Sequence, residues 1–177
     1  MKSFGSLLVF VIPLSTVIAG QPTVPQKNGL ERVVFEQYCF WTGEMKLGQI
    51  DGVVRTEAGF FQGHEVTLVD FDPTRVSLEQ LARRAREGGV GDRLHLPAGS
   101  RFTGTSIGGV PLGGAIDGRY RPAPASDQKK QIQGTAFARL DLTPEEATKV
   151  NAFFRSDPRK ALESLGPKQR AQLAAIQ

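Results

Sequence analysis

The sequence predicts an α+β protein, a sandwich of helices packed on one mixed sheet with a short helical tail at the C-terminus. Three observations predict this class. Between residues 31 and 87, apolar side chains follow strand, helix, strand, strand and helix spacing in turn. The last third carries repeated helix-start signals. Finally, 177 residues with 40% hydrophobic and 23% charged side chains have the size and composition of one folded domain.

Three segments have the pattern of strands. Residues 31–38 hold an apolar triplet, Val33-Val34-Phe35, that is typical of a buried strand. Residues 52–61 begin with two valines, and residues 65–71 largely alternate before Asp72-Pro73 stops the pattern.

Two helices are expected among these strands. Residues 40–49 have mixed helical character. The second helix begins at a capping box, in which the Ser77 side chain and the Gln80 side chain each bond the other's backbone N–H. It is expected to run to about Glu87, where Gly88-Gly89 ends it.

The rest of the chain divides into a loop region and a tail. Residues 88–134 are rich in Gly and Pro, which predicts irregular loops with one hairpin. Residues 135–177 are predicted to be a helical tail, because Thr143-Pro144-Glu145-Glu146 is a capped start with proline at the first helical position. That helix should reach about Phe154, and two shorter ones should start at residues 157–158 and 166–167.

The N-terminus has the pattern of an export signal. A charged start, an apolar run from Phe4 to Ile18 and the small residues Ala19 and Gly20 are typical of a secretory signal peptide over residues 1–20. Residues 21–29 then form a polar linker, and residues 30–177 form the domain. We expect a secreted or periplasmic protein with no membrane contact after cleavage. An uncleaved membrane anchor is the alternative reading.

Charge and cysteine content exclude several functions. The net charge is +4, and no run of five basic residues occurs, so nucleic-acid binding is not expected. A single cysteine, Cys39, excludes an internal disulfide and a multi-cysteine metal site. Cys39, His64 and His95 are possible soft ligands, but nothing in their spacing matches a metal site, so no metal or cofactor is expected.

Cys39 is the candidate for chemistry. It lies where the first strand meets the first helix, and free backbone N–H groups and the helix dipole at that position would stabilise a thiolate. Phe40 and Trp41 follow it and could wall an apolar pocket. From these residues alone, a buried structural cysteine remains the alternative.

A family resemblance supports the chemical reading. Five ordered motifs between Val33 and Glu87 resemble those of peptide methionine sulfoxide reductase A, whose fold is a ferredoxin-like α/β sandwich. They are Cys39-Phe40-Trp41-x-x-Glu44, Gly52-Val53 with Thr56 and Ala58-Gly59-Phe60, Gly63-His64-Glu65-Val66, Asp72-Pro73, and Ser77-x-x-Gln80-Leu81.

The resemblance has clear departures. The family carries a long loop with a substrate-binding tyrosine, but here Phe60 and Glu65 are only five residues apart, so the loop is missing. Tyr38 precedes the cysteine where the family has glycine. The segment Asp117 to Arg121 is too closely spaced to match the family's later tyrosine motif, and no residue after Gly88 is carried over.

The resemblance implies sulfoxide reduction. The Cys39 thiolate would attack the sulfoxide sulfur of methionine sulfoxide in proteins or of a related small sulfoxide. Phe40 and Trp41 would hold the substrate methyl group, and Glu65 would be the proton donor, because nearby aromatic rings favour the protonated carboxyl. Glu44 is expected to make a structural or capping hydrogen bond. The product would be a sulfenic acid, and with one cysteine an external reductant such as a thioredoxin-like protein must regenerate the thiol.

Two alternatives stay open at the level of sequence. The chain could be a non-catalytic relative that uses the scaffold as a binding module, which the missing tyrosine favours. It could also exchange mixed disulfides with a partner through Cys39, without turning over a sulfoxide.

Overall fold

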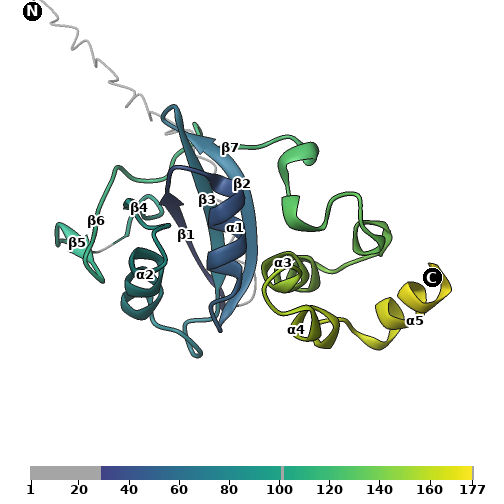
Figure 1. Cartoon of the computed structure of the whole chain (residues 1–177). Coiled ribbons are helices and arrows are strands. Elements are labelled where there is room, and N and C mark those ends of the chain that lie inside the picture. The colour runs from purple at the N-terminus through teal and green to yellow at the C-terminus, as the bar shows by residue number, and fades with distance from the viewer. Residues whose placement is uncertain (1–28, 101, 177) are drawn as a thin grey trace, which may run out of the picture.

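The main sheet has five strands in the order β4-β1-β3-β2-β7 (Figure 1). The computed structural model describes residues 29–100 and 102–176, so the expected signal peptide and most of the linker lie outside the described residues. The strands are β1 (Glu31–Glu36), β2 (Val53–Phe61), β3 (His64–Phe71), β4 (Arg93–His95) and β7 (Arg121–Pro122). The α-helices are α1 (Phe40–Gly48), α2 (Leu78–Glu87), α3 (Pro144–Phe153), α4 (Pro158–Glu163) and α5 (Pro167–Ile176).

The topology confirms the α+β class and the ferredoxin-like order. The chain runs β1, α1, β2, β3, α2, β4, and its first four strands lie in the order β4-β1-β3-β2. All four pairings within this sheet are antiparallel. Within the described residues, parallel pairing is confined to two isolated bridges, Leu94 with Leu112 and Pro97 with Ile116.

The sheet has two differently covered faces. Alternate residues such as Val33, Phe35 and Val69 face α1 and α2 and form the main apolar core with them. The intervening residues, including Val34 and Phe61, face away and pack with side chains of the loop that carries Ile116. Because α1 covers the first face, any group near its N-terminus shares that face of the sheet (Figure 1).

The predicted loop region contains more structure than the sequence indicated. The expected hairpin is present as β5 (Ser106–Ile107) and β6 (Val110–Pro111). Two further strands were not predicted: β4 pairs with β1, and β7 pairs with β2. Strands of two or three residues are too short to show an alternating pattern, and they form here because the sheet edges offer partners.

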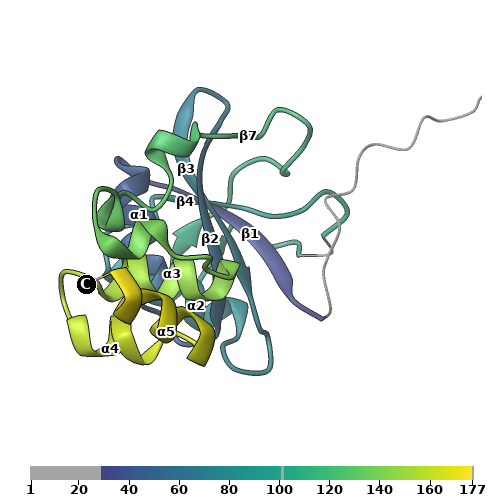
Figure 2. The same cartoon turned by 90° about the vertical axis from the view of Figure 1, so that its right-hand side faces the viewer.

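The C-terminal tail forms the predicted helices. The capping box of Thr143 and Glu146 is present at the start of α3, and that of Ser77 and Gln80 at the start of α2. Helix α3 packs against α1 and β2, while α4 and α5 extend beyond it (Figure 2). Apolar side chains of this tail and of the preceding 3₁₀ turns make a second cluster around Val150 and Leu165. Within the described residues, no helix has the length and apolar character to cross a membrane.

Two glycines let α1 lie close to its neighbours. A Cβ at Gly43 would come within 2.3 Å of the Thr67 hydroxyl on β3. A Cβ at Gly48 would come within 2.9 Å of Ala152 on α3. Side chains at these positions would push α1 away, so Gly43 sets how closely the start of α1 approaches β3 and Gly48 how closely its end approaches α3.

The ammonium group of Lys149 on α3 holds the end of α1. Its Nζ donates to the carbonyl oxygens of Gly48 at 2.8 Å and Ile50 at 2.9 Å. Burial lowers the pKa of Lys149 from 10.5 to about 8, although Asp51 opposes the shift. Below pH 8 both the folded and the unfolded state hold this proton. Between pH 8 and 10.5 only the unfolded state holds it, so this residue makes the free energy of unfolding rise with pH in that window.

We therefore expect Lys149→Met to change the pH dependence of stability. The free energy of unfolding of the native protein, minus that of Lys149→Met, should increase from pH 7.5 to pH 10, by at most about 1 kcal/mol per pH unit. Urea denaturation at four pH values measures both. Parallel pH profiles for the two proteins would contradict the assignment.

Candidate active site

Cys39 is the N-cap residue of α1. Its backbone is extended, with φ −140° and ψ 116°, and Phe40 begins the helix. Cys39 is a free, partly buried cysteine, whereas the preceding Tyr38 is 97% exposed. The junction of strand and helix predicted from the sequence is therefore confirmed, and the thiol lies at the edge of the core.

The Glu65 carboxyl group bonds the N-terminus of α1, at the position where the Cys39 thiol was expected. Oε2 of Glu65 on β3 accepts a hydrogen bond from the Phe40 N–H at 2.9 Å. The Cys39 side chain makes no capping hydrogen bond, so the expected contact between the thiol and the free helix N–H groups is not formed. The structure thus brings Glu65 against the residue next to Cys39. Among the described residues, Oε1 of Glu65 has no hydrogen-bond partner.

Aromatic side chains wall this junction. Phe40 is 4% exposed and packs edge-on against Phe60, with ring centroids 5.4 Å apart. It also makes an edge contact with Trp41 at 5.8 Å. Trp41 is the only tryptophan, and it is 36% exposed. Phe40 therefore supports the site mainly from within, and Trp41 offers the accessible ring.

The missing loop is replaced by a tight turn. Gln62 and Gly63 connect β2 to β3 with φ values of 52° and 86°, which are the left-handed conformations of a two-residue hairpin. Tyr120 lies away from the junction that carries Cys39. Its ring lies over Gly59 on the face away from α1, and its hydroxyl donates to Glu57 at 2.8 Å. Burial, reinforced by the Glu57 charge, raises the pKa of Tyr120 well above its usual value.

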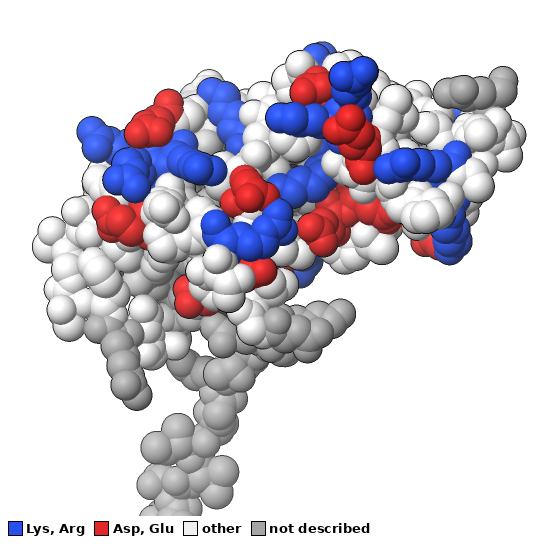
Figure 3. Space-filling view, turned by 90° about the horizontal axis from the view of Figure 1, so that it is seen from below, with Lys and Arg blue, Asp and Glu red and all other residues white. Residues whose placement is uncertain are grey.

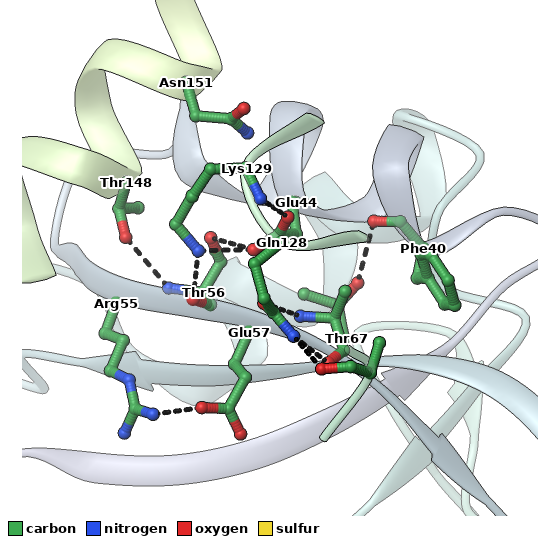
Figure 4. Close-up of polar contacts among 12 residues, drawn as sticks. Phe40, Glu44, Arg55, Thr56, Glu57, Thr67, Gln128, Lys129, Thr148 and Asn151 are labelled. Atoms are coloured by element: carbon green, nitrogen blue, oxygen red, sulfur yellow. Dashed lines mark hydrogen bonds and ion pairs between the residues drawn. The ribbon is translucent and has the colours of Figure 1, made fainter. Parts of the chain in front are cut away.

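Glu44 has a structural role, as expected, and its partner is the charged side chain of Lys129. The side chain is fully buried, and its Oε2 accepts from the Lys129 backbone N–H at 2.7 Å. The Lys129 ammonium group pairs with Oε1 of the same carboxylate and donates to the Thr56 carbonyl at 2.6 Å (Figure 4). Lys129 itself has φ 49°, an uncommon value for a residue other than glycine. The buried carboxylate therefore fixes both the backbone and the side chain of Lys129.

The neighbours of Lys129 are fixed as well. The Gln128 side-chain amide bonds both backbone groups of Ala58 on β2, at 3.0 and 2.8 Å (Figure 4). The Gln131 N–H donates to Oδ1 of the buried Asn151 on α3 at 2.9 Å. Residues 128–131 are thus attached to β2, α1 and α3 in turn. They hold Lys130 with its Nζ 4.8 Å from the centroid of the Trp41 ring. Lys130 was not among the residues predicted from the sequence, because no local pattern relates it to Trp41.

The two histidines lie outside this junction. His64 is exposed, His95 is buried, and both approach Glu36, with distances of 3.4 and 3.3 Å to its carboxylate oxygens. Nδ1 of His95 also lies 3.0 Å from the Gly114 carbonyl. These side chains lie on the sheet face opposite α1 and form a polar network. No cluster of three or more His, Cys, Asp or Glu side chains suited to a metal occurs in residues 29–100 or 102–176.

The fold and the site define a protein with a ferredoxin-like sheet and one cysteine at the start of its first helix, beside a carboxyl group. Comparison with known proteins identifies the family. The chain is 33% identical over 167 residues to peptide methionine sulfoxide reductase MsrA of Rippkaea orientalis, covering 82% of this chain and 74% of the relative. It is 35% identical over 92 residues to MsrA 1 of Rhizobium meliloti, covering 41% of this chain and 42% of that protein.

The chain therefore belongs to the peptide methionine sulfoxide reductase A family. The similarity to the Rippkaea orientalis protein extends well beyond the segment of residues 33–87. Among solved structures, methionine sulfoxide reductase A of Corynebacterium diphtheriae aligns with a TM-score of 0.34 and 19% identity, over 79% of this chain and 62% of that one. No protein-family model matches the chain.

The buried ion pair gives a direct test of the site's framework. Lys129→Met leaves the Glu44 carboxylate buried without its counter-ion, so we expect a loss of about 3–5 kcal/mol in the free energy of unfolding. Glu44→Gln combined with Lys129→Met removes both charges and should cost clearly less than Lys129→Met alone. Urea denaturation of the native protein and of both variants at pH 7 measures these differences.

Lys168→Met is the matched control. Lys168 pairs with Asp141 at 2.5 Å, but both side chains are mostly exposed. Its removal should cost clearly less than that of Lys129, because an exposed ion pair contributes little to stability. If Lys129→Met were as mild as this control, the pair would not hold residues 128–131 in place.

Proposed function

We propose that this protein is an exported reductase of methionine sulfoxide in proteins, with Cys39 as the nucleophile and Glu65 as the proton donor. The single observation that carries the proposal is the placement of the Glu65 carboxyl group against the first helical residue after Cys39. Membership of the family supports the reaction type. Export is proposed from the apolar run between Phe4 and Ile18.

The carboxyl group suits an acid role by its geometry. The Phe40 N–H holds Oε2, which fixes the orientation of the group. Oε1 is then the oxygen that would carry the proton and face the substrate. A protonated Glu65 would donate to the sulfoxide oxygen as the Cys39 sulfur attacks the sulfoxide sulfur.

The first half-reaction balances as an oxygen transfer. The thiol and the sulfoxide become a sulfenic acid on Cys39 and a thioether, so the cysteine sulfur is oxidised by two electrons and the substrate sulfur is reduced by two. The exposed Trp41 ring is the surface proposed to hold the substrate methyl group, with Phe40 supporting it.

The second half-reaction needs thiols from outside. The sequence contains one cysteine, so a thiol of a partner would attack the sulfenic acid, releasing water and forming a mixed disulfide. A second thiol of that partner would then release Cys39. A protein with two neighbouring thiols, such as a thioredoxin-like reductant, has this chemistry, and dithiothreitol would replace it in an assay.

The proposal predicts how two substitutions act on turnover of N-acetyl methionine sulfoxide amide with excess dithiothreitol. Cys39→Ser should abolish turnover, because the nucleophile is lost. Glu65→Gln keeps a group that can accept from the Phe40 N–H but cannot act as an acid, so kcat should fall by about 10²–10⁴ while the fold is kept. Chromatography of the thioether product measures both, and circular dichroism checks the fold.

Glu57→Gln is the matched control. Glu57 lies on β2, on the opposite sheet face, with its carboxyl bonded to Tyr120 and Arg55, so turnover should be retained. No turnover by the native chain would overturn the proposal. Mixed disulfides with a dithiol protein would then indicate thiol exchange, and their absence would indicate a non-catalytic binding module.

A further inference from the structure

Two cationic side chains flank the aromatic site, and neither has a role in the chemistry proposed above. Lys130 lies in the 3₁₀ turn η2 (Lys130–Ile132), over the Trp41 ring, and Arg121 lies in β7. A cation beside a substrate-holding ring affects which charges the substrate can carry next to its sulfoxide. We therefore considered whether these two residues select the substrate.

Lys130 is held next to Trp41 by the buried framework. Glu44 lies on α1 three residues after Trp41, so both side chains project from neighbouring turns of one helix. Because Glu44 binds Lys129, the residue after Lys129 is carried to the Trp41 ring. The backbone of Lys130 is thereby held beside the ring, which reduces the entropic cost of placing its ammonium group there.

Arg121 reaches the same face through strand pairing. It lies opposite Phe60 in the β2–β7 pair, and Phe60 lies opposite Glu65 in the β2–β3 pair. Directly opposed residues in antiparallel strands place their side chains on the same face. Arg121, Phe60 and Glu65 therefore form a row across three strands on the face that carries α1. The alternation agrees, since Tyr120 lies on the other face and Ala123 packs with Phe40.

Among the described residues, acidic side chains compensate little of the positive charge of Lys130 and Arg121. Arg121 is exposed and has no ion pair among the described residues. In the described part of the chain, Lys130 pairs with one acidic side chain, Asp127, at 3.8 Å, and its Nζ donates to the Ser126 carbonyl at 3.1 Å. An exposed pair at such a distance is weak and leaves most of the ammonium charge available. Elsewhere the surface is mixed: the face in Figure 3 has acidic and basic side chains interspersed.

We propose that Lys130 and Arg121 select peptides in which acidic residues flank the oxidised methionine. The sulfoxide side chain would lie against Trp41 while flanking carboxylates approach the two cations. This inference rests on the proposed function, since it assumes that the sulfoxide binds at Trp41. It goes further by naming the substrate's sequence context and the residues that recognise it.

Binding is measured separately from turnover. Trp41 is the only tryptophan, so its fluorescence reports on the site directly. In the Cys39→Ser variant, three capped tripeptides with a central methionine sulfoxide and flanking Glu, Gln or Lys are titrated at low ionic strength. The Glu peptide should bind at least about five-fold more tightly than the Gln peptide, and the Lys peptide should bind more weakly than both. Added 0.5 M NaCl should reduce the difference, because salt screens exposed charges.

Charge-removing variants assign the effect to the two residues. Lys130→Gln and Arg121→Gln, each in the Cys39→Ser background, should lower the ratio of Glu-peptide to Gln-peptide affinity. The double variant should bring that ratio to within about two-fold of one. Lys168→Gln and Arg159→Gln remove cations on the C-terminal tail and should leave the ratio unchanged.

The outcomes separate this inference from the proposed function. Equal affinity for the Glu and Gln peptides, or a preference that survives the double variant, overturns the inference even if the native chain reduces all three peptides. The expected affinity order without any turnover overturns the proposed reductase activity and supports charge selection at Trp41. Charge selection with the same order in kcat/KM supports both.

Discussion

The buried pair of Glu44 and Lys129 is the constraint on which the site depends. A carboxylate with no exposure must be neutralised and hydrogen-bonded, and here one residue supplies both an ammonium group and a backbone N–H. These contacts with the Glu44 carboxylate hold Lys129 in a left-handed conformation and attach the segment after β7 to α1. Thus the helix that carries Cys39 and Trp41 also fixes the segment that lies beside them, and the side wall of the site forms together with the core.

The start of α1 is fixed from the other side by close packing. Gly43 allows the helix to approach Thr67 on β3, and that strand also supplies the carboxylate of Glu65 to the Phe40 N–H. A carboxyl oxygen at this position satisfies one of the backbone N–H groups that the first turn of a helix leaves without a partner. The Glu65 carboxyl group is therefore oriented by the same helix that has Cys39 at its N-cap, and a tight turn at Gln62 and Gly63 connects the two strands beside it.

The two sheet faces divide the polar side chains between them. The α1 face holds Cys39, Glu65 and the aromatic side chains of Phe40 and Phe60. The opposite face holds Tyr120 with Glu57, and the histidines with Glu36. Because side chains alternate along a strand, neighbours in sequence such as His64 and Glu65 belong to different environments. This division places Tyr120 on the sheet face away from Cys39.

The helices with capping boxes and the three long strands could be predicted from the sequence, because they depend on local patterns. The family motifs also singled out Glu65, which the structure places against the residue after Cys39. The remaining features depend on contacts between segments that are distant in the chain. Strands β4 and β7 are too short to have a pattern and form only against existing edges. The thiol was expected at the helix N–H groups, but a carboxylate from β3 binds there. Glu44 with Lys129, and Trp41 with Lys130, are contacts between residues far apart in the chain, and burial and packing alone select them.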